Sequence, residues 1–414
     1  MNRTRSEVVT LGCRLNALES EVIQTRADEA DLTDTVIFNT CAVTSEAERQ
    51  ARQAIRKVKR ERPDAQIIVT GCAAQIAPQK FADMPEVARV IGNDEKLARE
   101  TYLGTDRLAV ADIMKSRAAP EHTIGGFETR TRAFLQIQQG CDHRCTFCII
   151  PFGRGNSRSL GVEAILKQAA RLTAAGYREI VLTGVDISSY GTDLGIRLTL
   201  GALCRLLLKR TPGLVRLRLS SLDPAVVDDA LLALIAEDER LMPHLHLSVQ
   251  AGSDMILKRM KRRHLRADVI ALTRRLREAR ADLVLGADLI AGFPTEDEAM
   301  FRDSMRIVEE ADLTYLHVFP FSARVGTPAA RMPQLSGSIR RERAGRLRAL
   351  GDERRERYLA SLAGSEAEIL AEKDNRGYTQ HYAPARIDRA VNPGEVVRVR
   401  ITGAEGGTLT AQAA

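Results

Sequence analysis

The chain has 414 residues, is 44% hydrophobic and only 4% aromatic, and carries a formal net charge of +7. This length predicts two or three domains, and no apolar run approaches the roughly 20 residues that a membrane-spanning helix needs. We expect no secretory signal, because the first residues, MNRTRSEVVTLGC, contain no apolar h-region. The seven cysteines are an odd number, so we expect a cytoplasmic protein whose thiols serve metal or redox chemistry and do not form disulfides.

Three short apolar runs in the first hundred residues each end in a cysteine. They are β-branched, as is typical of buried strands, and helical segments lie between them, which predicts a parallel α/β sheet. Because the carboxyl ends of parallel strands share one edge, we expect Cys13, Cys41 and Cys72 to gather at the edge where such sheets bind ligands. The alternative for each thiol alone is a buried structural cysteine. The runs are EVVTLGC (7–13), TVIFNTC (35–41) and QIIVTGC (66–72).

Residues 104–130 form a looser connection of mixed charge with Gly and Pro, and we expect a domain boundary inside it. The strand–helix alternation then resumes from Ala133 to about Ser322. Six β/α units are too few for a closed eight-fold barrel, so they predict a partial, open (β/α) barrel with its site at the C-terminal strand ends. The six strands are expected at 133–138, 179–183, 214–220, 244–249, 282–288 and 315–319.

The C-terminal part changes character. A charged helix is expected over roughly 336–360, and short strands separated by Gly, Asn and Pro follow it, which predicts a small antiparallel β-barrel. The expected fold class is therefore α/β. The expected parts are an N-terminal parallel α/β sheet domain (1–115), a central partial (β/α)6 barrel (127–358) and a small C-terminal β-barrel (359–414).

Three further cysteines, Cys141, Cys145 and Cys148, stand within eight residues in a C-x3-C-x2-C pattern. Soft thiolates select zinc, copper(I) or iron–sulfur clusters. Structural zinc normally takes four ligands in paired spacing, and the nearest fourth candidate, His143, is squeezed between two of the cysteines. A 4Fe–4S cluster held by only three cysteines would keep one iron open for a small molecule. Structural zinc is the alternative, and Cys204, on an apolar helix face, is expected in the core.

The C-x3-C-x2-C pattern resembles the signature of the radical S-adenosylmethionine (SAM) superfamily, in which this loop also follows the first strand of a partial barrel. The resemblance implies that Cys141, Cys145 and Cys148 are catalytic ligands and that the open iron binds SAM. It also implies that an electron from the cluster cleaves SAM to a 5′-deoxyadenosyl radical, while the protein supplies orientation.

Polar residues stand at the ends of the later expected strands. The stretch TGVD (183–186) resembles the superfamily's glycine motif, whose backbone meets the SAM amino group, and Gly lets the main chain approach closely. Any one such strand end is ordinary loop chemistry, but five in succession around one barrel mouth favour a cofactor site. We predict SAM-binding residues at Thr183, Gly184, Asp186, Ser220, Ser248, Gln250 and Asp288.

Two three-cysteine groups, one on an N-terminal α/β domain and one on a radical-SAM barrel, resemble the methylthiotransferase family over essentially the whole chain. The resemblance rests on TLGCRLNALESE, FNTCAVTSEAERQARQAIRK, VTGCAAQ and QGCDHRCTFCIIPFGRGNSRS, and the C-terminal strands resemble the RNA-gripping TRAM domain. It implies two 4Fe–4S clusters and SAM as cofactors. An auxiliary cluster on Cys13, Cys41 and Cys72 would carry the sulfur, which a first SAM methylates, while a second SAM gives the radical.

The stretch LGCRLNALESE resembles the branch of the family that acts on N(6)-threonylcarbamoyladenosine in tRNA. The implied target is the purine just 3′ of the anticodon, methylthiolated at C2. The alternatives are isopentenyladenosine in tRNA or a ribosomal protein as substrate. From another class, a non-catalytic iron–sulfur protein that binds RNA or senses redox state also stays open.

Two basic segments suit a phosphate backbone, although solvated helix faces are the alternative reading of each. Residues 49–62 carry seven bases and one acid, and residues 258–280 carry ten bases and two acids. Residues 359–414, in contrast, hold six bases against seven acids. We expect the anticodon stem-loop of tRNA and an electron donor such as flavodoxin or ferredoxin as partners, no membrane association, and a monomer.

Overall fold

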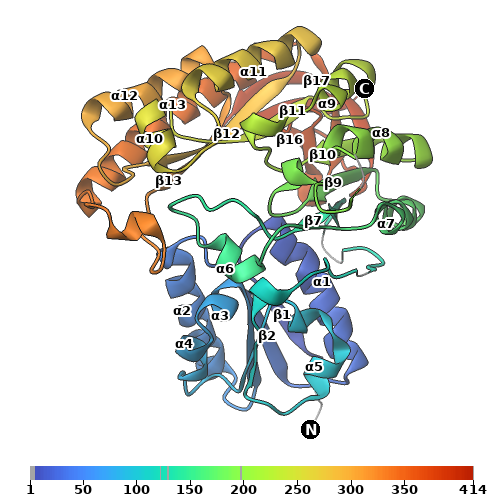
Figure 1. Cartoon of the computed structure of the whole chain (residues 1–414). Helices are drawn as coiled ribbons and strands as arrows, with labels where there is room; N and C mark the ends of the chain where they lie inside the picture. The colour runs from blue at the N-terminus through green and yellow to red at the C-terminus, as the bar shows by residue number, and fades with distance from the viewer. Residues whose placement is uncertain (1–4, 122, 128–129, 196–197, 414) are drawn as a thin grey trace.

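The computed structural model describes residues 5–121, 123–127, 130–195 and 198–413, and Figure 1 shows them as two lobes. The lower lobe is the N-terminal α/β unit. The upper lobe holds the central strands and helices, with the C-terminal strands behind them. The segment 104–130, where we expect a domain boundary, includes residues 122 and 128–129, which lie outside the described residues.

A five-stranded parallel sheet forms the N-terminal lobe in the order β1-β2-β3-β4-β5. The three expected strands are present, whereas β4 and β5 are too short to stand out as apolar runs. Strand β2 is buried throughout because helices cover both faces, α1 and α5 on one and α2, α3 and α4 on the other. The strands are β1 (Glu7–Thr10), β2 (Thr35–Thr40), β3 (Gln66–Gly71), β4 (Arg89–Ile91) and β5 (Leu108–Ala109). The helices are α1 (Arg14–Glu29), α2 (Ser45–Glu61), α3 (Cys72–Ile76), α4 (Pro78–Ala82) and α5 (Arg99–Leu103).

Six strands in two parallel sheets, β10-β9-β6 and β11-β12-β13, confirm the partial barrel. Two isolated parallel bridges, Leu217–Leu241 and Leu222–Leu247, join the sheets between β10 and β11. The order around the barrel is therefore β6-β9-β10-β11-β12-β13. The strands are β6 (Arg132–Gln136), β9 (Glu179–Thr183), β10 (Arg216–Leu219), β11 (His244–Gln250), β12 (Val284–Ala291) and β13 (Tyr315–Pro320).

Helices cover the outer face of these strands and share one large apolar core with them. Helix α1 of the N-terminal lobe also joins this core, through Leu15, Leu18 and Val22. A short antiparallel pair, β7 (Gln138–Gln139) and β8 (Arg158–Ser159), frames the loop that carries the second cysteine group. The covering helices are α7 (Val162–Ala174), α8 (Leu200–Arg210), α9 (Asp229–Glu237), α11 (Arg266–Ala279), α12 (Glu298–Glu310) and α13 (Gly337–Ser361). Helix α6 (Ile150–Arg154) packs instead on α3 of the N-terminal lobe, and the short α10 (Asp254–Arg259) belongs to a separate apolar cluster.

The last strands close into a barrel of order β14-β15-β16-β18-β17 around its own apolar core. Its pairings are antiparallel except β16–β18, which is parallel. The strands are β14 (Glu366–Ala371), β15 (Arg376–Thr379), β16 (Pro384–Ile387), β17 (Val396–Glu405) and β18 (Thr408–Ala413).

The small barrel docks on the N-terminal ends of the large barrel's strands. The Tyr382 hydroxyl accepts from Arg132 at 3.2 Å, and the Arg218 guanidinium lies 4.8 Å from the centre of the Tyr382 ring. Beneath them Glu179, which is 1% exposed, pairs with Arg218 at 3.1 Å and Arg132 at 3.5 Å. The C-terminal barrel thus closes the end of the partial barrel opposite to the strand ends that precede the cysteines.

No helix in the described part of the chain combines the length and apolar character needed to cross a bilayer.

Candidate functional site

The three N-terminal cysteines follow three adjacent strands of the parallel sheet. Cys13 stands immediately before α1, Cys41 follows β2, and Cys72 opens α3. Glycines in the left-handed region make two of these turns, Gly12 with φ 121° and Gly71 with φ 94°. A Cβ on Gly12 would lie 2.8 Å from the Cys41 Cβ, so this turn brings the first two cysteine loops into close approach.

The environment of these thiols suits a soft metal group. Desolvation and the nearby Cys72 sulfur together raise the pKa of Cys41 to about 11, and desolvation raises the pKa of Cys13 against the lowering effect of Arg154. All three cysteines are free thiols. The fit to a metal group rests on the donor set: three free thiols at adjacent strand ends are soft ligands, and a bound metal offsets the cost of losing their protons. The residues present therefore fit an iron–sulfur cluster with three protein ligands.

The second group, Cys141, Cys145 and Cys148, lies on the loop after β7, at the mouth of the partial barrel. Gly140, with φ 71°, precedes it, and a Cβ there would lie 1.9 Å from the Asn156 carbonyl oxygen. Burial raises the pKa of Cys148 to about 11 and, with the Asp186 charge, that of Cys141 to about 12. These three free thiols therefore also fit an iron–sulfur cluster with three protein ligands.

The expected glycine motif meets the cysteine loop through Gln138. The Gln138 Oε1 accepts from the backbone N–H groups of Val185 at 3.0 Å and Asp186 at 2.8 Å. A Cβ on Gly184 would lie 2.8 Å from the Gln138 carbonyl oxygen, so this position requires glycine. Asp186 lies 3.1 Å from the His143 Nε2, and the ligand atoms of Cys141, His143 and Asp186 all lie within 4.8 Å of one another. His143 thus faces Asp186.

Arg262 connects the cysteine loop to two other strand ends. Its guanidinium donates to the Cys145 Sγ at 3.6 Å and to the Ser248 carbonyl oxygen at 2.8 Å, and it lies 3.3 Å from the Asp223 carboxylate. The side chains of Ser220 and Thr183 make no hydrogen bond to another expected site residue among the described residues. The structure therefore connects Ser248 to the cysteines through Arg262, and leaves Ser220 and Thr183 at their strand ends without such a contact.

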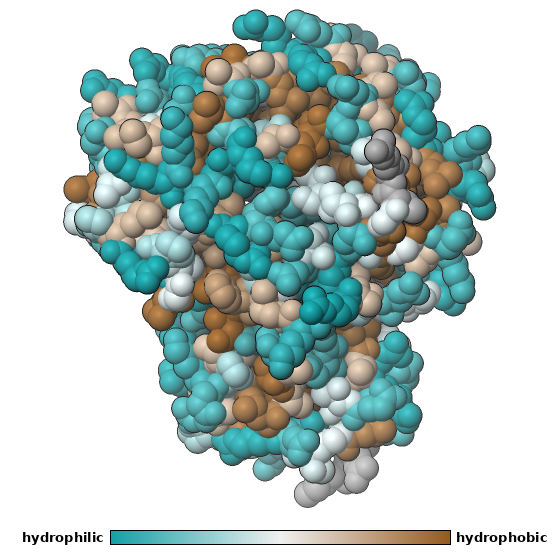
Figure 2. All heavy atoms as spheres, viewed as in Figure 1, coloured by the Kyte–Doolittle hydropathy of each residue, from teal (hydrophilic) through white to brown (hydrophobic). Residues whose placement is uncertain are grey.

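A cavity of about 210 Å³ lies at the barrel mouth, between the two lobes. The N-terminal lobe supplies part of its wall, and the loop after β13 is tied to that lobe by the ion pair of Arg324 with Glu48 and by the Ser45 N–H donating to the Ser322 hydroxyl at 3.1 Å. Figure 2 shows hydrophobic residues at the narrowing between the lobes. The lining residues are Val43, Thr44, Phe147, Gln250, Asp288, Ile290, Phe319, Pro320, Phe321 and Ser322.

Two of the predicted SAM-binding residues, Gln250 and Asp288, line this cavity. Gln250 has φ 72°, an unusual conformation for a residue other than glycine and one that often marks functional sites. Asp288 lies 3.0 Å from the His246 Nε2 and 3.5 Å from the His317 Nδ1. The two histidines hold the Asp288 pKa well below its usual range against the opposing effect of burial, so the carboxylate is charged and fixed in orientation.

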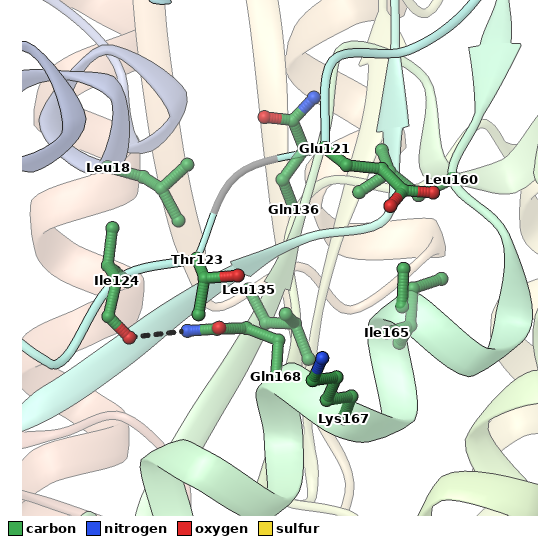
Figure 3. A pocket seen from close by; sticks show the side chains of 11 residues that line it. Leu18, Glu121, Thr123, Ile124, Leu135, Gln136, Leu160, Ile165, Lys167 and Gln168 are labelled. Carbon is green, nitrogen blue, oxygen red and sulfur yellow. Dashed lines mark hydrogen bonds between the residues drawn. The ribbon is translucent and has the colours of Figure 1, made fainter.

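A second, smaller pocket of about 100 Å³ lies apart from these residues (Figure 3). It is enclosed by α1, by Glu121, Thr123 and Ile124, and by β6 and α7, and the Gln168 Nε2 donates to the Ile124 carbonyl oxygen at 2.9 Å across it. Of the predicted site residues, none lines it. It lies on the helix side of β6, and the site described above does not include it.

Sequence comparison decides the family. The model of the radical SAM superfamily matches residues 135–308, and that of the uncharacterized protein family UPF0004 matches residues 5–92. The chain is 48% identical over 409 residues to the threonylcarbamoyladenosine tRNA methylthiotransferase MtaB of Rickettsia prowazekii, covering 99% of this chain and 97% of the relative. The chain belongs to the MtaB methylthiotransferase family.

Other members of the MtaB family match over nearly the same length. That of Bacillus subtilis is 36% identical over 417 residues, covering 95% of this chain and 92% of the relative. Among solved structures, the radical SAM methyltransferase TsrM from Kitasatospora setae superimposes with a TM-score of 0.55 at 16% identity, covering 79% of this chain and 77% of that chain. At that identity the likeness shows the fold alone.

Several residues of the site are not evident from the sequence, among them Gln138, Asp223 and Arg262. Gln138 stands just before the cysteine loop, in QIQQGC, and Asp223 within SSLDP, so both were close to motifs that we did examine. Arg262 was hidden in the basic segment 258–280, which suggested phosphate binding. Several arginines of that segment instead bind carbonyls and carboxylates of the barrel, among them Arg259, Arg266, Arg277 and Arg280.

Proposed function

We propose that the chain transfers a methylthio group to C2 of N(6)-threonylcarbamoyladenosine, next to the anticodon of tRNA, by radical SAM chemistry. One observation carries the proposal: two three-cysteine groups occur in a chain that is 48% identical, over 99% of its length, to an enzyme named for this reaction. The chemistry needs two clusters, one to generate a radical and one to supply sulfur, and the chain has one cysteine group for each.

The two groups have distinct roles in this proposal. Cys141, Cys145 and Cys148 hold the catalytic 4Fe–4S cluster, and Cys13, Cys41 and Cys72 hold the auxiliary one. When bound, these clusters and SAM supply the 5′-deoxyadenosyl radical that takes a hydrogen atom from the substrate carbon, and the sulfur and methyl group that replace it.

The chain's own residues orient SAM. A Cβ on Gly184 would lie 2.8 Å from the Gln138 carbonyl oxygen, so only glycine lets this strand end pack directly against the segment that leads into the cysteine loop. We propose that the backbone at Thr183 and Gly184 and the Asp186 carboxylate meet the amino end of SAM, and that Ser220, Ser248, Gln250 and Asp288 line the rest of its site. Arg262 would keep the strand end at Ser248 next to the cysteine loop, because its guanidinium donates to both the Ser248 carbonyl oxygen and the Cys145 sulfur.

The cavity at the barrel mouth suits a purine turned out of an RNA loop. Flipped bases are held between aromatic or apolar side chains and read by a few polar groups. Phe147, Phe319 and Phe321 supply the aromatic surface, and they stand beside Gln250 and Asp288, so a base held there would lie against the proposed SAM site. The N-terminal lobe forms part of the wall, so a base in this cavity would lie at the junction of the two lobes that carry the two clusters.

We further propose that the anticodon stem-loop is the part of tRNA that binds, with α2 contributing phosphate contacts through exposed side chains such as Arg56 and Lys57, which are 53% and 68% exposed. Flavodoxin or ferredoxin is the proposed electron donor, and the proposed state is a cytoplasmic monomer. The proposed domain divisions stay at 1–115, 127–358 and 359–414.

The test is nucleoside mass spectrometry of tRNA from a strain that lacks this protein. Methylthiolated threonylcarbamoyladenosine should be replaced by its unmethylthiolated form, and the wild-type gene, but not Cys141→Ala, should restore it. If isopentenyladenosine or a ribosomal protein lost the methylthio group instead, the substrate assignment would be wrong. If the purified protein with SAM and a reductant gave no 5′-deoxyadenosine, the chain would be a non-catalytic iron–sulfur protein.

A further inference from the structure

Arg154 lies between the two cysteine groups. It ends α6, six residues after Cys148, and its side chain is 1% exposed. Its Nε–H donates to the Cys72 Sγ at 3.0 Å. A single buried side chain of the barrel's cysteine loop therefore contacts a cysteine of the N-terminal sheet.

The other side of the Arg154 guanidinium is held by Glu19, which is 0% exposed and accepts from the Nη2 at 2.8 Å. Glu19 also pairs with Lys96 at 2.7 Å, and Lys96 is 0% exposed as well. Buried charges are stable only when they are paired. Two cations share one carboxylate here, so one positive charge is left without a carboxylate of its own. The other acceptors of the Arg154 guanidinium include the neutral Asn16 Oδ1, at 2.5 Å from the Nη2, and the Cys72 sulfur, which can carry the balancing negative charge when it is a thiolate.

The backbone is packed as closely as the side chains at this point. A Cβ on Gly153 would lie 3.2 Å from the Cys72 Cβ. The Asn93 amide donates both to the Gly153 carbonyl oxygen and, at 3.8 Å, to the Cys72 Sγ. Helix α6 is therefore fixed on α3, and the loop carrying Cys148 is held at a set distance from Cys72.

We infer that Arg154 is a positioning residue for the iron–sulfur cluster that the proposed function places on Cys13, Cys41 and Cys72. It donates an N–H to the Cys72 sulfur and puts a positive charge beside the cluster, which stabilises the more negative, reduced state. Hydrogen bonds to cluster sulfurs and the net local charge set the reduction potential of such clusters. Arg154 also fixes the separation of the two clusters. This inference rests on the proposed function, since it presumes a cluster at each cysteine group.

The experiment is a redox titration of the N-terminal cluster, followed by electron paramagnetic resonance, in full-length protein in which Cys141, Cys145 and Cys148 are alanine. Four variants are compared in this background. Arg154→Gln removes the charge, Arg154→Lys keeps it but loses the planar fork, and Glu19→Gln removes the countercharge. The control is Arg158→Gln, because Arg158 is a buried arginine of the same segment, 3% exposed, that pairs with Asp94.

We expect the reduction potential to fall in Arg154→Gln, to fall less in Arg154→Lys, to rise in Glu19→Gln and to stay near the starting value in Arg158→Gln. The inference is overturned if Arg154→Gln shifts the potential no further than Arg158→Gln does. Should Arg154→Gln take up no iron, Arg154→Lys decides: a lowered potential supports the inference and an unchanged one overturns it. In protein with all six cysteines intact, weaker spin–spin coupling between the reduced clusters in Arg154→Lys would support the fixed separation, and unchanged coupling would overturn it.

Iron analysis of the unaltered protein distinguishes a failure of the proposed function from a failure of the inference about Arg154. If the wild-type chain binds no iron at the N-terminal cysteines, the proposed function itself fails. If it binds iron there and the Arg154 variants titrate as wild type does, only the inference about Arg154 fails.

Discussion

Each cysteine group contains three thiols, but one group is local in the sequence and the other is brought together by the fold. Cys141, Cys145 and Cys148 fit within one eight-residue loop, whereas Cys13, Cys41 and Cys72 are separated by 28 and 31 residues (41 − 13 and 72 − 41). The loop group needs only its own backbone to bring the sulfurs together. The N-terminal group exists only when β1, β2 and β3 pair in parallel, because that pairing puts three distant turns on one sheet edge.

This difference teaches where each group is vulnerable. A local cluster loop fails when one of its own residues changes. A group assembled by a sheet can also fail through the turns and the packing that hold the strands in register, and through contacts from another part of the chain, such as that of Arg154 with Cys72.

The largest effects are expected from substitution of a cysteine, and the two cysteine groups should differ in which reaction is lost. Cys145→Ala should abolish both reductive SAM cleavage and methylthiolation, because its cluster generates the radical. Cys13→Ala should abolish methylthiolation yet leave 5′-deoxyadenosine formation, because the barrel loop does not depend on it. Each variant should keep about four of the roughly eight irons expected for two cubane clusters. Methylthio product from Cys13→Ala, measured by mass spectrometry, would rule out the auxiliary role.

A glycine substitution next to Cys72 should affect the N-terminal cysteine group without replacing any cysteine. Gly71 has φ 94°, and a Cβ there would lie 2.4 Å from the Thr40 backbone nitrogen. Gly71→Ala should therefore shift the Cys72 turn, with a left-handed strain on the order of 1–2 kcal/mol in addition to the clash. We expect iron to be lost from the N-terminal group only. Gly364→Ala is the control, since Gly364 also has positive φ (83°) but open space around it, and its iron content should match wild type.

Substitution of a residue that lines the cavity at the barrel mouth should have a smaller effect, on the binding of tRNA. Phe319 is 39% exposed and lines the cavity, and base stacking on an aromatic side chain contributes about 1–3 kcal/mol. Phe319→Ala should raise KM for tRNA about tenfold, which corresponds to about 1.4 kcal/mol, and leave SAM cleavage without tRNA intact. Leu103→Ala, at an apolar position on α5 that is 54% exposed, should not change KM. An equal rise in both variants would argue against base binding by Phe319.

The smallest effect on activity is expected at the end of the barrel far from both groups, where a substitution should act on stability instead. Burial raises the pKa of Glu179, but Arg218 and Arg132 outweigh it and bring the pKa down to about 2. A depressed acid pKa contributes stability above the unfolded value, near 4.5, and loses it as the pH falls toward 2. Glu179→Gln should thus lower the free energy of unfolding by about 3 kcal/mol at neutral pH.

The same difference between wild type and Glu179→Gln should shrink as the pH falls below about 4.5, because a protonated Glu179 resembles glutamine. Denaturant unfolding of both proteins at several pH values measures it. A difference that stayed constant down to the lowest pH would show that the arginines do not hold Glu179 ionised.

Much of the fold followed from local patterns. The buried β-branched runs and their helical connections predicted β1 to β3 and the six barrel strands, since a strand buried on both faces needs a continuous apolar run. Strands β4 and β5 were missed because three and two residues are too few to form such a run. The parallel β16–β18 pair was also missed, because pairing direction depends on how the small barrel closes and not on composition.

The site was predictable to the extent that it depends on residue type. Of the predicted SAM-binding residues, Gln250 and Asp288 share one cavity, and Asp186 lies beside Cys141. The contacts of Asp288 with His246 and His317 could not be predicted, because they arise from side chains on three adjacent strands and depend on register. Composition alone made Arg262 part of a phosphate-binding patch, whereas packing turns it inward to Cys145.

The sequence by itself determined the close spacing of Cys141, Cys145 and Cys148, the strand ends at which Cys13, Cys41 and Cys72 stand, and the family, because these follow from residue identity and local patterns. Only the tertiary structure decided that Arg154 of the barrel loop contacts Cys72, and that Tyr382 of the small barrel docks on Arg132 and Arg218. Those contacts join segments that are 82 to 250 residues apart, and such pairings depend on how whole units pack, which no local pattern encodes.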